Sequence, residues 1–162
     1  MTITLHFVRH AQGFHNLCIE NHSLPDPLLT DTGITQCRTL SQTFPSPAKI
    51  THLVASPLRR TLYTTLYSFP DPIARGIPII ALPEIQETSP LPCDTGSEPA
   101  ALVEEFKDTV DLGLVGEGWN CKSGRWDANA GAIERRAREA RVWLREVGEG
   151  AGEGWRRFIW WL

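Results

Sequence analysis

The chain contains no apolar run that approaches the ~20 residues of a membrane span, and it shows no secretory signal. Its four cysteines, Cys18, Cys37, Cys93 and Cys121, lie too far apart for a CxxC metal or redox motif. We therefore expect free thiols in a reducing compartment, the cytoplasm. No residues show the spacing of metal ligands, and we expect neither a metal nor another cofactor.

The net charge of the chain does not indicate a macromolecular partner. A net charge of −3 on 162 residues gives no reason to expect a nucleic acid or a membrane surface as partner. The hydrophobic content of 41% and the charged content of 22% are ordinary for a globular protein. We find no internal repeat, and we expect residues 1–162 to form one domain; the oligomeric state stays open.

Apolar runs of strand length alternate with segments of helical periodicity along the chain. Strands are predicted at residues 3–8, 50–55, 77–81 and 158–162, helices at about 30–44, 58–67, 98–110 and 129–147, and a flexible segment at 148–154. This alternation predicts an α/β fold with a mainly parallel sheet and helices on both faces.

The first predicted strand ends in Arg9-His10, and a turn of small residues follows. Residues at the carboxyl ends of parallel strands lie where open α/β sheets bind ligands. The guanidinium of Arg9 matches phosphate oxygens, and the imidazole of His10 is a nucleophile near physiological pH. An arginine directly after a buried strand is costly without an anionic partner, so the pair favours a phosphate site over a surface ion pair.

A second junction of the same kind follows the second predicted strand, in the stretch Ser56-Pro57-Leu58-Arg59-Arg60. The amides of a first helical turn favour anions, and an arginine there adds further donors. Both junctions are expected at one edge of the sheet. Adjacent helix positions do not share a face, so at least one of Arg59 and Arg60 is expected to be solvated.

Together these motifs resemble the histidine phosphatase superfamily, the phosphoglycerate-mutase-like group. The resemblance is carried by Arg9-His10-Ala11 with Asn16, Leu29-Thr30 with Gly33 and Gln36, and Ser56-Pro57-Leu58 with Arg60 and Thr64. The order and the separations of the three motifs make the combination specific. The similarity covers the chain to about residue 147, and the stretch Leu82–Gly96 and the predicted helix Ala132–Leu144 look like small fungal-type members. It implies a three-layer α/β/α sandwich of the phosphoglycerate-mutase type.

The resemblance also implies roles for individual residues. His10 matches the histidine that becomes phosphorylated, and Arg9 and Arg60 match the two arginines that clamp the phosphoryl group. Asn16 matches an asparagine that lines the pocket. His15 lies near the site and is given no role beyond a possible contact with the substrate.

Members of this family use an acidic residue as proton donor to the leaving oxygen, and two glutamates compete for that role. Glu84 stands in a literal Leu-x-Glu context, whereas Glu87 matches it conservatively and precedes the turn at 92–96. We favour Glu87 slightly, and expect the other to be an exposed loop carboxylate. In either case the general acid must hold a proton in the substrate complex.

The implied activity is hydrolysis of small phosphomonoesters by two in-line phosphoryl transfers through a phosphohistidine, without a metal. One alternative is a weak or inactive relative that binds phosphorylated ligands or a protein partner. A mutase-type phosphotransferase is less favoured because the longer mutase insertions are absent, and a fragment that does not function alone is a further possibility. The substrate itself is not readable from the sequence.

Family members carry a second histidine after the next buried strand, and no histidine here matches it. The corresponding apolar run is 158–162, where the sequence stops. We therefore interpret the chain as a C-terminally shortened member with an incomplete pocket. Its last strand is expected to lie unpaired or at an edge of the sheet.

Overall fold

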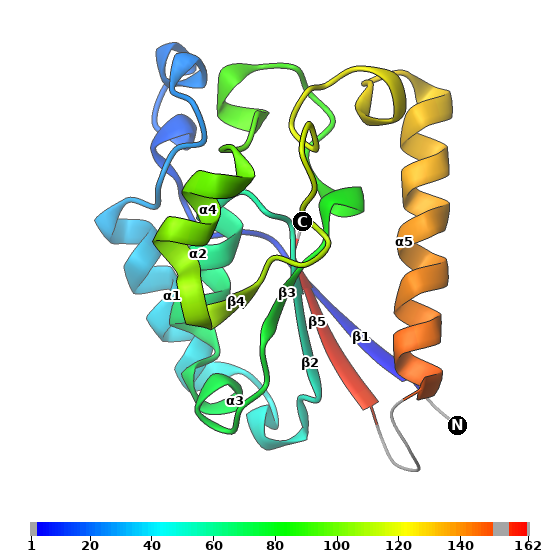
Figure 1. The fold of residues 1–162 in the computed structure, drawn as a ribbon. Coiled ribbons are helices and arrows are strands. Elements are labelled where there is room, and N and C mark those ends of the chain that lie inside the picture. Colours follow the sequence, from blue (N-terminus) through cyan, green and yellow to red (C-terminus); the bar gives the residue numbers. More distant parts are fainter. Residues whose placement is uncertain (1–2, 151–155, 162) are drawn as a thin grey trace.

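The computed structural model describes residues 3–150 and 156–161, which form a five-stranded parallel sheet with helices on both faces (Figure 1). The strands are β1 (Ile3–Val8), β2 (His52–Ala55), β3 (Ile79–Ala81), β4 (Val110–Asp111) and β5 (Arg156–Trp161). The α-helices are α1 (Asp31–Thr43), α2 (Arg59–Ser68), α3 (Pro70–Ala74), α4 (Pro99–Phe106) and α5 (Ala130–Gly150). The predicted α/β architecture is therefore confirmed.

Short 3-10 turns fill the connections between these elements. They are η1 (Phe14–Asn16), η2 (Ile19–Ser23), η3 (Pro47–Lys49), η4 (Pro83–Ile85), η5 (Pro92–Asp94), η6 (Lys107–Thr109) and η7 (Gly124–Trp126). Prolines begin three of them, because the fixed φ of proline suits a first helical position. None of the helices in the described part of the chain is both long and apolar enough to cross a membrane.

The last strand lies inside the sheet, so its expected place at an edge is wrong. The strand order is β1-β5-β2-β3-β4, and Phe158 stands opposite both Leu5 of β1 and His52 of β2. A strand with two parallel neighbours satisfies its backbone groups on both sides. Leu162, which also belonged to the predicted strand, lies outside the described residues.

The main core lies between the sheet and the group of α1, α2 and α4, on the left in Figure 1. Its fully buried members come from the sheet (Leu53, Ile79), from α2 and its cap (Leu58, Leu62) and from α4 (Leu102). Strand β3 and most of β2 are apolar runs, as expected where helices cover both faces of a parallel sheet.

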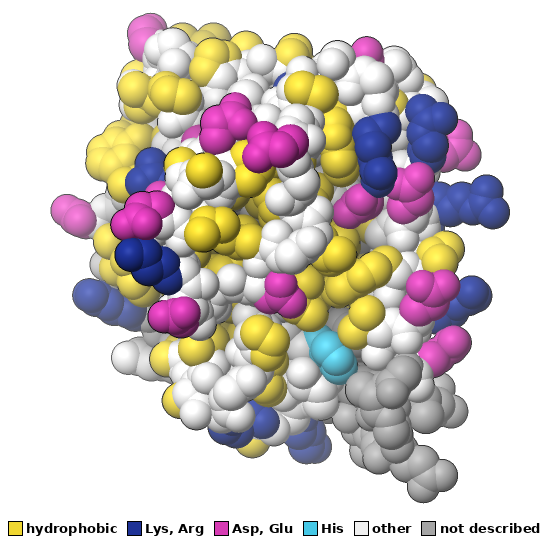
Figure 2. Space-filling model, in the orientation of Figure 1, with side chains coloured by type: hydrophobic (Ala, Val, Ile, Leu, Met, Phe, Trp, Pro, Cys, Tyr) yellow, Lys and Arg dark blue, Asp and Glu magenta, His cyan; other side chains and the backbone are white. Residues whose placement is uncertain are grey.

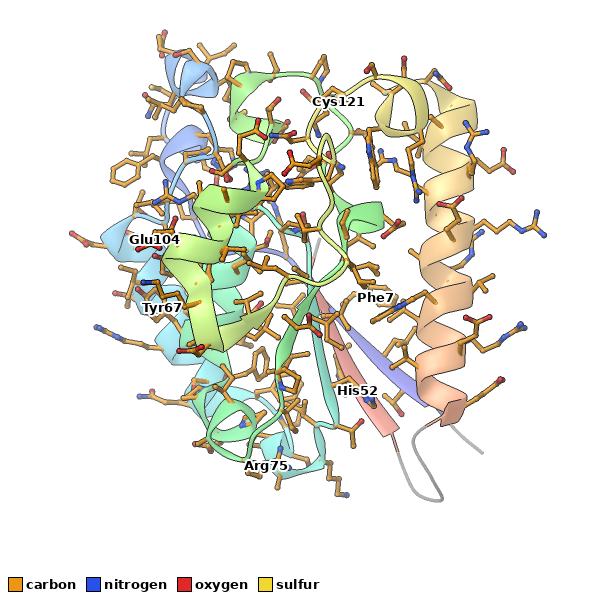
Figure 3. All side chains as sticks on the ribbon, viewed as in Figure 1. Phe7, His52, Tyr67, Arg75, Glu104 and Cys121 are labelled. Atoms are coloured by element: carbon orange, nitrogen blue, oxygen red, sulfur yellow. The ribbon has the colours of Figure 1, made fainter. Side chains whose placement is uncertain are left out.

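On the other face, α5 packs against the sheet through Ala140 and Leu144, which contact Val54 and Leu82. Between β1 and α5 lies a cavity of about 650 Å³ that Leu5 and Phe7 help to line. These two side chains are 37% and 58% exposed. Figure 2 shows hydrophobic side chains along the hollow beside α5, and Figure 3 shows Phe7 on the side of the sheet that faces this helix.

Two predicted helix ends are wrong, for different reasons. The helix predicted to reach residue 110 ends at Phe106, because Lys107 turns to a φ of 26° and Val110 pairs with Ile79 in the sheet. The segment expected to be flexible from 148 is helical as far as Gly150, since a packed apolar face outweighs the ~1 kcal/mol cost of each glycine. Residues 151–154 of that segment lie outside the described residues.

Candidate active site

The carboxyl ends of β1 and β2 meet at one edge of the sheet, and His10 lies in the turn that follows β1. It is only 8% exposed, and its Nδ1 lies 2.7 Å from the carbonyl oxygen of Ala11. Because a carbonyl only accepts, Nδ1 carries the proton and Nε2 keeps its lone pair. Burial lowers the pKa of His10 from 6.5 to about 4; the hydrogen bond to Ala11 opposes this shift, and the charge of Arg60 adds to it. His10 is therefore a neutral imidazole at physiological pH.

Arg60 lies in the first turn of α2 and is completely buried. Its Nη1 donates to the carbonyl oxygen of Cys93 at 2.5 Å, and its Nη2 lies 3.0 Å from Asp94 and 3.4 Å from Glu87. The neighbouring Arg59 turns toward the surface and pairs with Glu105 at 2.8 Å. The two adjacent arginines thus separate as helical geometry predicts, and Arg60 is the one that enters the site.

A direct bond joins the helix of Arg60 to the turn of His10. The backbone N–H of Ala11 donates to the Thr64 hydroxyl at 3.1 Å, and that hydroxyl donates to the Arg60 carbonyl at 2.6 Å. Thr64 is the last residue of the third sequence motif, and this contact explains why a hydroxyl is needed at that position. The two phosphate-type junctions are therefore held in one fixed relationship.

His15 lies beside His10, with 5.3 Å between the ring centroids. It is buried, and its Nδ1 has no hydrogen-bond partner among the described residues. Burial, followed by the charge of Arg60, lowers the pKa of His15 to about 4, although Asp94 raises it. The backbone of Gly13 makes room for this ring, because a Cβ there would lie 2.7 Å from the imidazole Nδ1. The structure thus brings both histidines into one cluster.

Asn16 lies in the same turn but is exposed, and its side-chain oxygen accepts the backbone N–H of Gly13 at 2.9 Å. This bond fixes the turn that carries His15. The pocket-lining role predicted for Asn16 stays a prediction.

The two candidate proton donors lie in different surroundings. Glu87 approaches Arg60 at 3.4 Å, and together with Arg9 it lines a cavity of about 370 Å³ at the end of β1. Glu84 instead pairs with Arg125 at 2.6 Å, and its side chain is only 18% exposed, so the expectation that the second glutamate is an exposed loop carboxylate is wrong. The geometry therefore associates Glu87, and not Glu84, with the two arginines of the motifs.

The motif Leu29-Thr30 with Gly33 supports this turn from the side of α1. The Thr30 hydroxyl caps α1 by accepting the Gly33 N–H at 3.1 Å, and the Thr30 N–H donates to the Gln12 carbonyl at 3.0 Å. A Cβ on Gly33 would collide with that same carbonyl. The glycine is required because the start of α1 touches the backbone two residues after His10.

The long loop between β1 and α1 is fastened at Asp26, which is buried. Its carboxylate accepts the N–H of Arg59 at 3.0 Å and both the N–H and the hydroxyl of Ser97, at 2.9 and 2.7 Å. Burial raises the pKa of this carboxyl, and the hydrogen bonds partly oppose the rise. Asp26 therefore connects three segments that surround the site.

Three residues of the site were not predicted: Asp94 and Lys122, which lie close to Arg60 and Glu87, and Asp26. Asp94 stands in a turn whose Pro and Gly residues signal a loop, but nothing in its local pattern indicates a contact with Arg60. Lys122 lies in a Gly-rich loop 36 residues after Gln86, to whose side chain it bonds. No cluster of three or more His, Cys, Asp or Glu side chains suited to a metal occurs within residues 3–150 and 156–161.

The site contains polar atoms that no neighbour satisfies. Within the described residues, His15 Nδ1, Arg60 Nε and Ser56 Oγ are buried and have no hydrogen-bond partner. Buried polar groups in proteins are almost always paired, so such atoms at one edge of a sheet mark a place for a polar ligand. With Arg9 and Arg60 nearby, an anion suits the site best.

The fold of this chain resembles those of several solved structures. Among solved structures, Bacillus stearothermophilus YhfR matches with a TM-score of 0.58 and 18% identity, over 98% of this chain and 73% of that chain. The alpha-ribazole phosphatase from Shigella flexneri matches with a TM-score of 0.57 and 18% identity, over 96% and 72%. A phosphoserine phosphatase mutant from Entamoeba histolytica matches with 0.53 and 16%, over 98% and 73%.

At these identities the solved structures establish the fold alone. A search of curated proteins finds no match. The model of the histidine phosphatase superfamily, branch 1, matches residues 5–151, which is most of the sequence. The chain therefore belongs to branch 1 of the histidine phosphatase superfamily.

Proposed function

We propose that this protein is a phosphatase that hydrolyses small phosphomonoesters through a phosphohistidine at His10. The observation that carries the proposal is the neutral, buried imidazole of His10 beside the buried guanidinium of Arg60. The unpaired polar atoms of the site and the phosphatases among the similar structures support it. Arg9, Asn16 and His15 are proposed to contact the substrate.

In the first transfer, Nε2 of His10 attacks phosphorus and the ester P–O bond breaks. Glu87 gives its proton to the departing oxygen, which leaves as an alcohol. The proton on Nδ1 stays hydrogen-bonded to Ala11, and this bond stabilises the positive ring that forms when Nε2 bonds to phosphorus. Arg9 and Arg60 stabilise charge on the equatorial oxygens.

In the second transfer, water attacks the phosphorus of the phosphohistidine and the P–N bond breaks. Glu87, now a carboxylate, takes the proton from the water, and inorganic phosphate leaves. His10 and Glu87 return to their starting protonation states. We assign this role to Glu87 because Glu84 is committed to Arg125.

The proposal includes a small phosphorylated substrate and neither a nucleic acid nor a membrane as partner. It also includes a cytoplasmic location, which the four free thiols support.

The test is to trap the intermediate. Wild-type protein is mixed with a radiolabelled phosphomonoester and quenched in alkali, where phosphohistidine survives; we expect label on His10 and release of inorganic phosphate. His10→Gln should lose both signals, whereas the matched control His52→Gln should keep them, since His52 lies at the opposite end of the sheet (Figure 3).

Other outcomes would assign the site differently. Phosphate binding without label or turnover would favour an inactive relative that binds phosphorylated ligands. Label that moves to an added alcohol rather than to water would favour a phosphotransferase. Label on a residue other than His10 would overturn the proposal.

A further inference from the structure

The short segment that carries Glu87 is held by a lysine from a distant part of the chain. Lys122 Nζ donates to the backbone carbonyl of Glu87 at 2.6 Å and to the side-chain oxygen of Gln86 at 2.9 Å. Lys122 belongs to the loop between β4 and α5. Cys121, the residue before it, is labelled at the top of Figure 3, above the carboxyl ends of the strands. One amine thus fixes two consecutive residues of the proton-donor segment.

Two further contacts hold the same segment from this side. The Gln86 side-chain NH₂ donates to the carbonyl of Trp119 at 2.5 Å, and Gln86 is buried. Arg136 of α5 approaches the carbonyls of Glu84 and Gln86 at 3.4 and 3.3 Å. Residues of α5 and of the loop before it therefore hold residues 84–87 in place. Among Lys122, Trp119 and Arg136, only Lys122 bonds to the carbonyl of Glu87.

The backbone of Lys122 is unusual as well. Its φ is 51°, in the left-handed region that a lysine seldom adopts. Such conformations persist where the surrounding structure determines them, and they gather at functional sites. Here the conformation accompanies an amine that reaches the Glu87 carbonyl.

We propose that Lys122 is a positioning residue for the proton donor: its ammonium group holds Glu87 so that the carboxylate faces Arg60 and the phosphoryl site. This inference rests on the proposed function. Charge-assisted hydrogen bonds are roughly twice as strong as neutral ones, so the hold on Glu87 depends on the proton of Lys122.

The charges around Lys122 place its titration close to the working pH. They are Arg136 on α5, Asp94 on η5, Glu87 on the donor segment and Arg60 on α2. Burial, followed by Arg136, lowers the pKa of Lys122 to about 8, whereas Asp94 and Glu87 raise it. Lys122 is therefore charged at neutral pH and loses its charge above about pH 8, and with it the strong form of both hydrogen bonds.

The experiment compares the pH profile of kcat for a phosphomonoester in wild type, Lys122→Met and Lys122→Arg. Wild type should lose activity above about pH 8. Lys122→Met should lower kcat at pH 7 by about tenfold to a hundredfold, as expected for a displaced catalytic group, and should abolish the alkaline fall. Lys122→Arg should restore part of kcat and stay active to higher pH, because arginine keeps its charge. Lys107→Met, at an exposed lysine paired with Glu104, is the matched control and should behave as wild type.

A second measurement separates this inference from the proposed function. Hydrogen exchange of the amides of residues 84–88, compared at one pH, should be faster in Lys122→Met than in wild type, and unchanged in Lys107→Met. Faster exchange in a protein without phosphatase activity would contradict the proposed function and leave the structural hold in place. Unchanged exchange, or a Lys122→Met enzyme with a wild-type pH profile, would overturn the role of Lys122.

Discussion

The hydroxyl of Thr64 accepts a hydrogen bond from the backbone N–H of Ala11 at 3.1 Å, and this bond joins α2 to the turn after β1. It links the elements that carry Arg60 and His10, although the two bonded residues are 53 positions apart in the sequence. Both ends are buried, so the contact has no water to replace it. The geometry of the candidate active site therefore depends on Thr64, whose hydroxyl bonds to the backbone of both elements.

Thr64→Val keeps the shape of the side chain and leaves the Ala11 N–H without its acceptor. A buried unpaired donor costs about 1–3 kcal/mol, and we expect unfolding in urea to show a loss of that size. The phosphatase rate should fall as well, because His10 and Arg60 are no longer held together. Thr39→Val is the control. The Thr39 hydroxyl donates to the Thr35 carbonyl of its own helix at 3.0 Å, as the Thr64 hydroxyl does to the Arg60 carbonyl. Thr39 is exposed, however, and this bond stays within α1. Equal losses in both variants would contradict this interpretation.

The adjacent arginines of α2 provide a second matched pair. Arg60→Lys removes the planar donor group that reaches Cys93, Asp94 and Glu87 at once, and a lysine cannot reproduce that arrangement. We expect kcat/KM to fall by about 10²–10³ and inhibition by vanadate to weaken. Arg59→Lys should change either quantity by less than about threefold, since the ion pair of Arg59 with Glu105 is partly open to water and lies away from His10, and such pairs contribute about 1 kcal/mol or less. Steady-state kinetics with a phosphomonoester checks both, and a similar response of the two variants would speak against a role for Arg60.

The two glutamates can be distinguished by the leaving group. Glu87→Gln should slow hydrolysis of an alkyl phosphate by about 10²–10⁴, the usual contribution of a general acid. It should slow p-nitrophenyl phosphate far less, because that leaving group departs without a proton. Glu84→Gln breaks the ion pair with Arg125 and should leave the ratio of the two rates unchanged. A shift of that ratio in Glu84→Gln alone would transfer the proton-donor role to Glu84.

Acid should destabilise the fold through the two buried histidines. Their pKa values fall from 6.5 to about 4 on folding, so the unfolded chain binds more protons between these limits. The contribution of each histidine is complete above pH 6.5 and is lost as pH falls toward 4, by up to about 3 kcal/mol. The double variant His10→Gln, His15→Gln should therefore show a shallower decline in unfolding free energy between pH 6.5 and 4.5. Above pH 7 wild type and variant should show the same pH slope, which serves as the internal control; equal slopes in acid would refute the assignment.

Much of the fold follows from local patterns. The strand at 3–8 has the predicted bounds because an apolar run and a following polar turn define it, and α2 differs by one residue at each end. The strand β4 was not predicted, because two residues are too few to show a periodic pattern. Val110–Asp111 is a strand because it pairs with the neighbouring β3. The interior position of β5 is likewise a property of its two neighbours and not of its own sequence.

Some residues of the candidate site can be found from the local sequence, and others only from contacts between distant parts of the chain. Arg9 and His10 directly follow β1, and Arg60 lies in the first turn of the helix after β2, so their places and residue types made them candidates from the sequence alone. Asp94 and Lys122 were not predicted, because their importance comes only from contacts with Arg60 and Glu87, far away in the sequence. The contact of Asn16 with the Gly13 N–H was not predicted either, because the motif match indicated a place in the pocket and carried no information about this turn.

Gly33 offers a test of how closely α1 must approach the site. In Gly33→Ala the new Cβ meets the backbone carbonyl of Gln12, which also accepts the Thr30 N–H and cannot move alone. Strain of this kind costs about 1–3 kcal/mol, and the displaced turn should lower kcat as well. Gly131→Ala places the same methyl group near the start of α5, where its closest neighbour is 3.5 Å away, and should change stability by no more than about 1 kcal/mol, in the favourable direction. Urea unfolding with parallel rate measurements distinguishes the two. If Gly33→Ala were as stable and as active as Gly131→Ala, the contact between α1 and the turn after His10 would have no role in shaping the site.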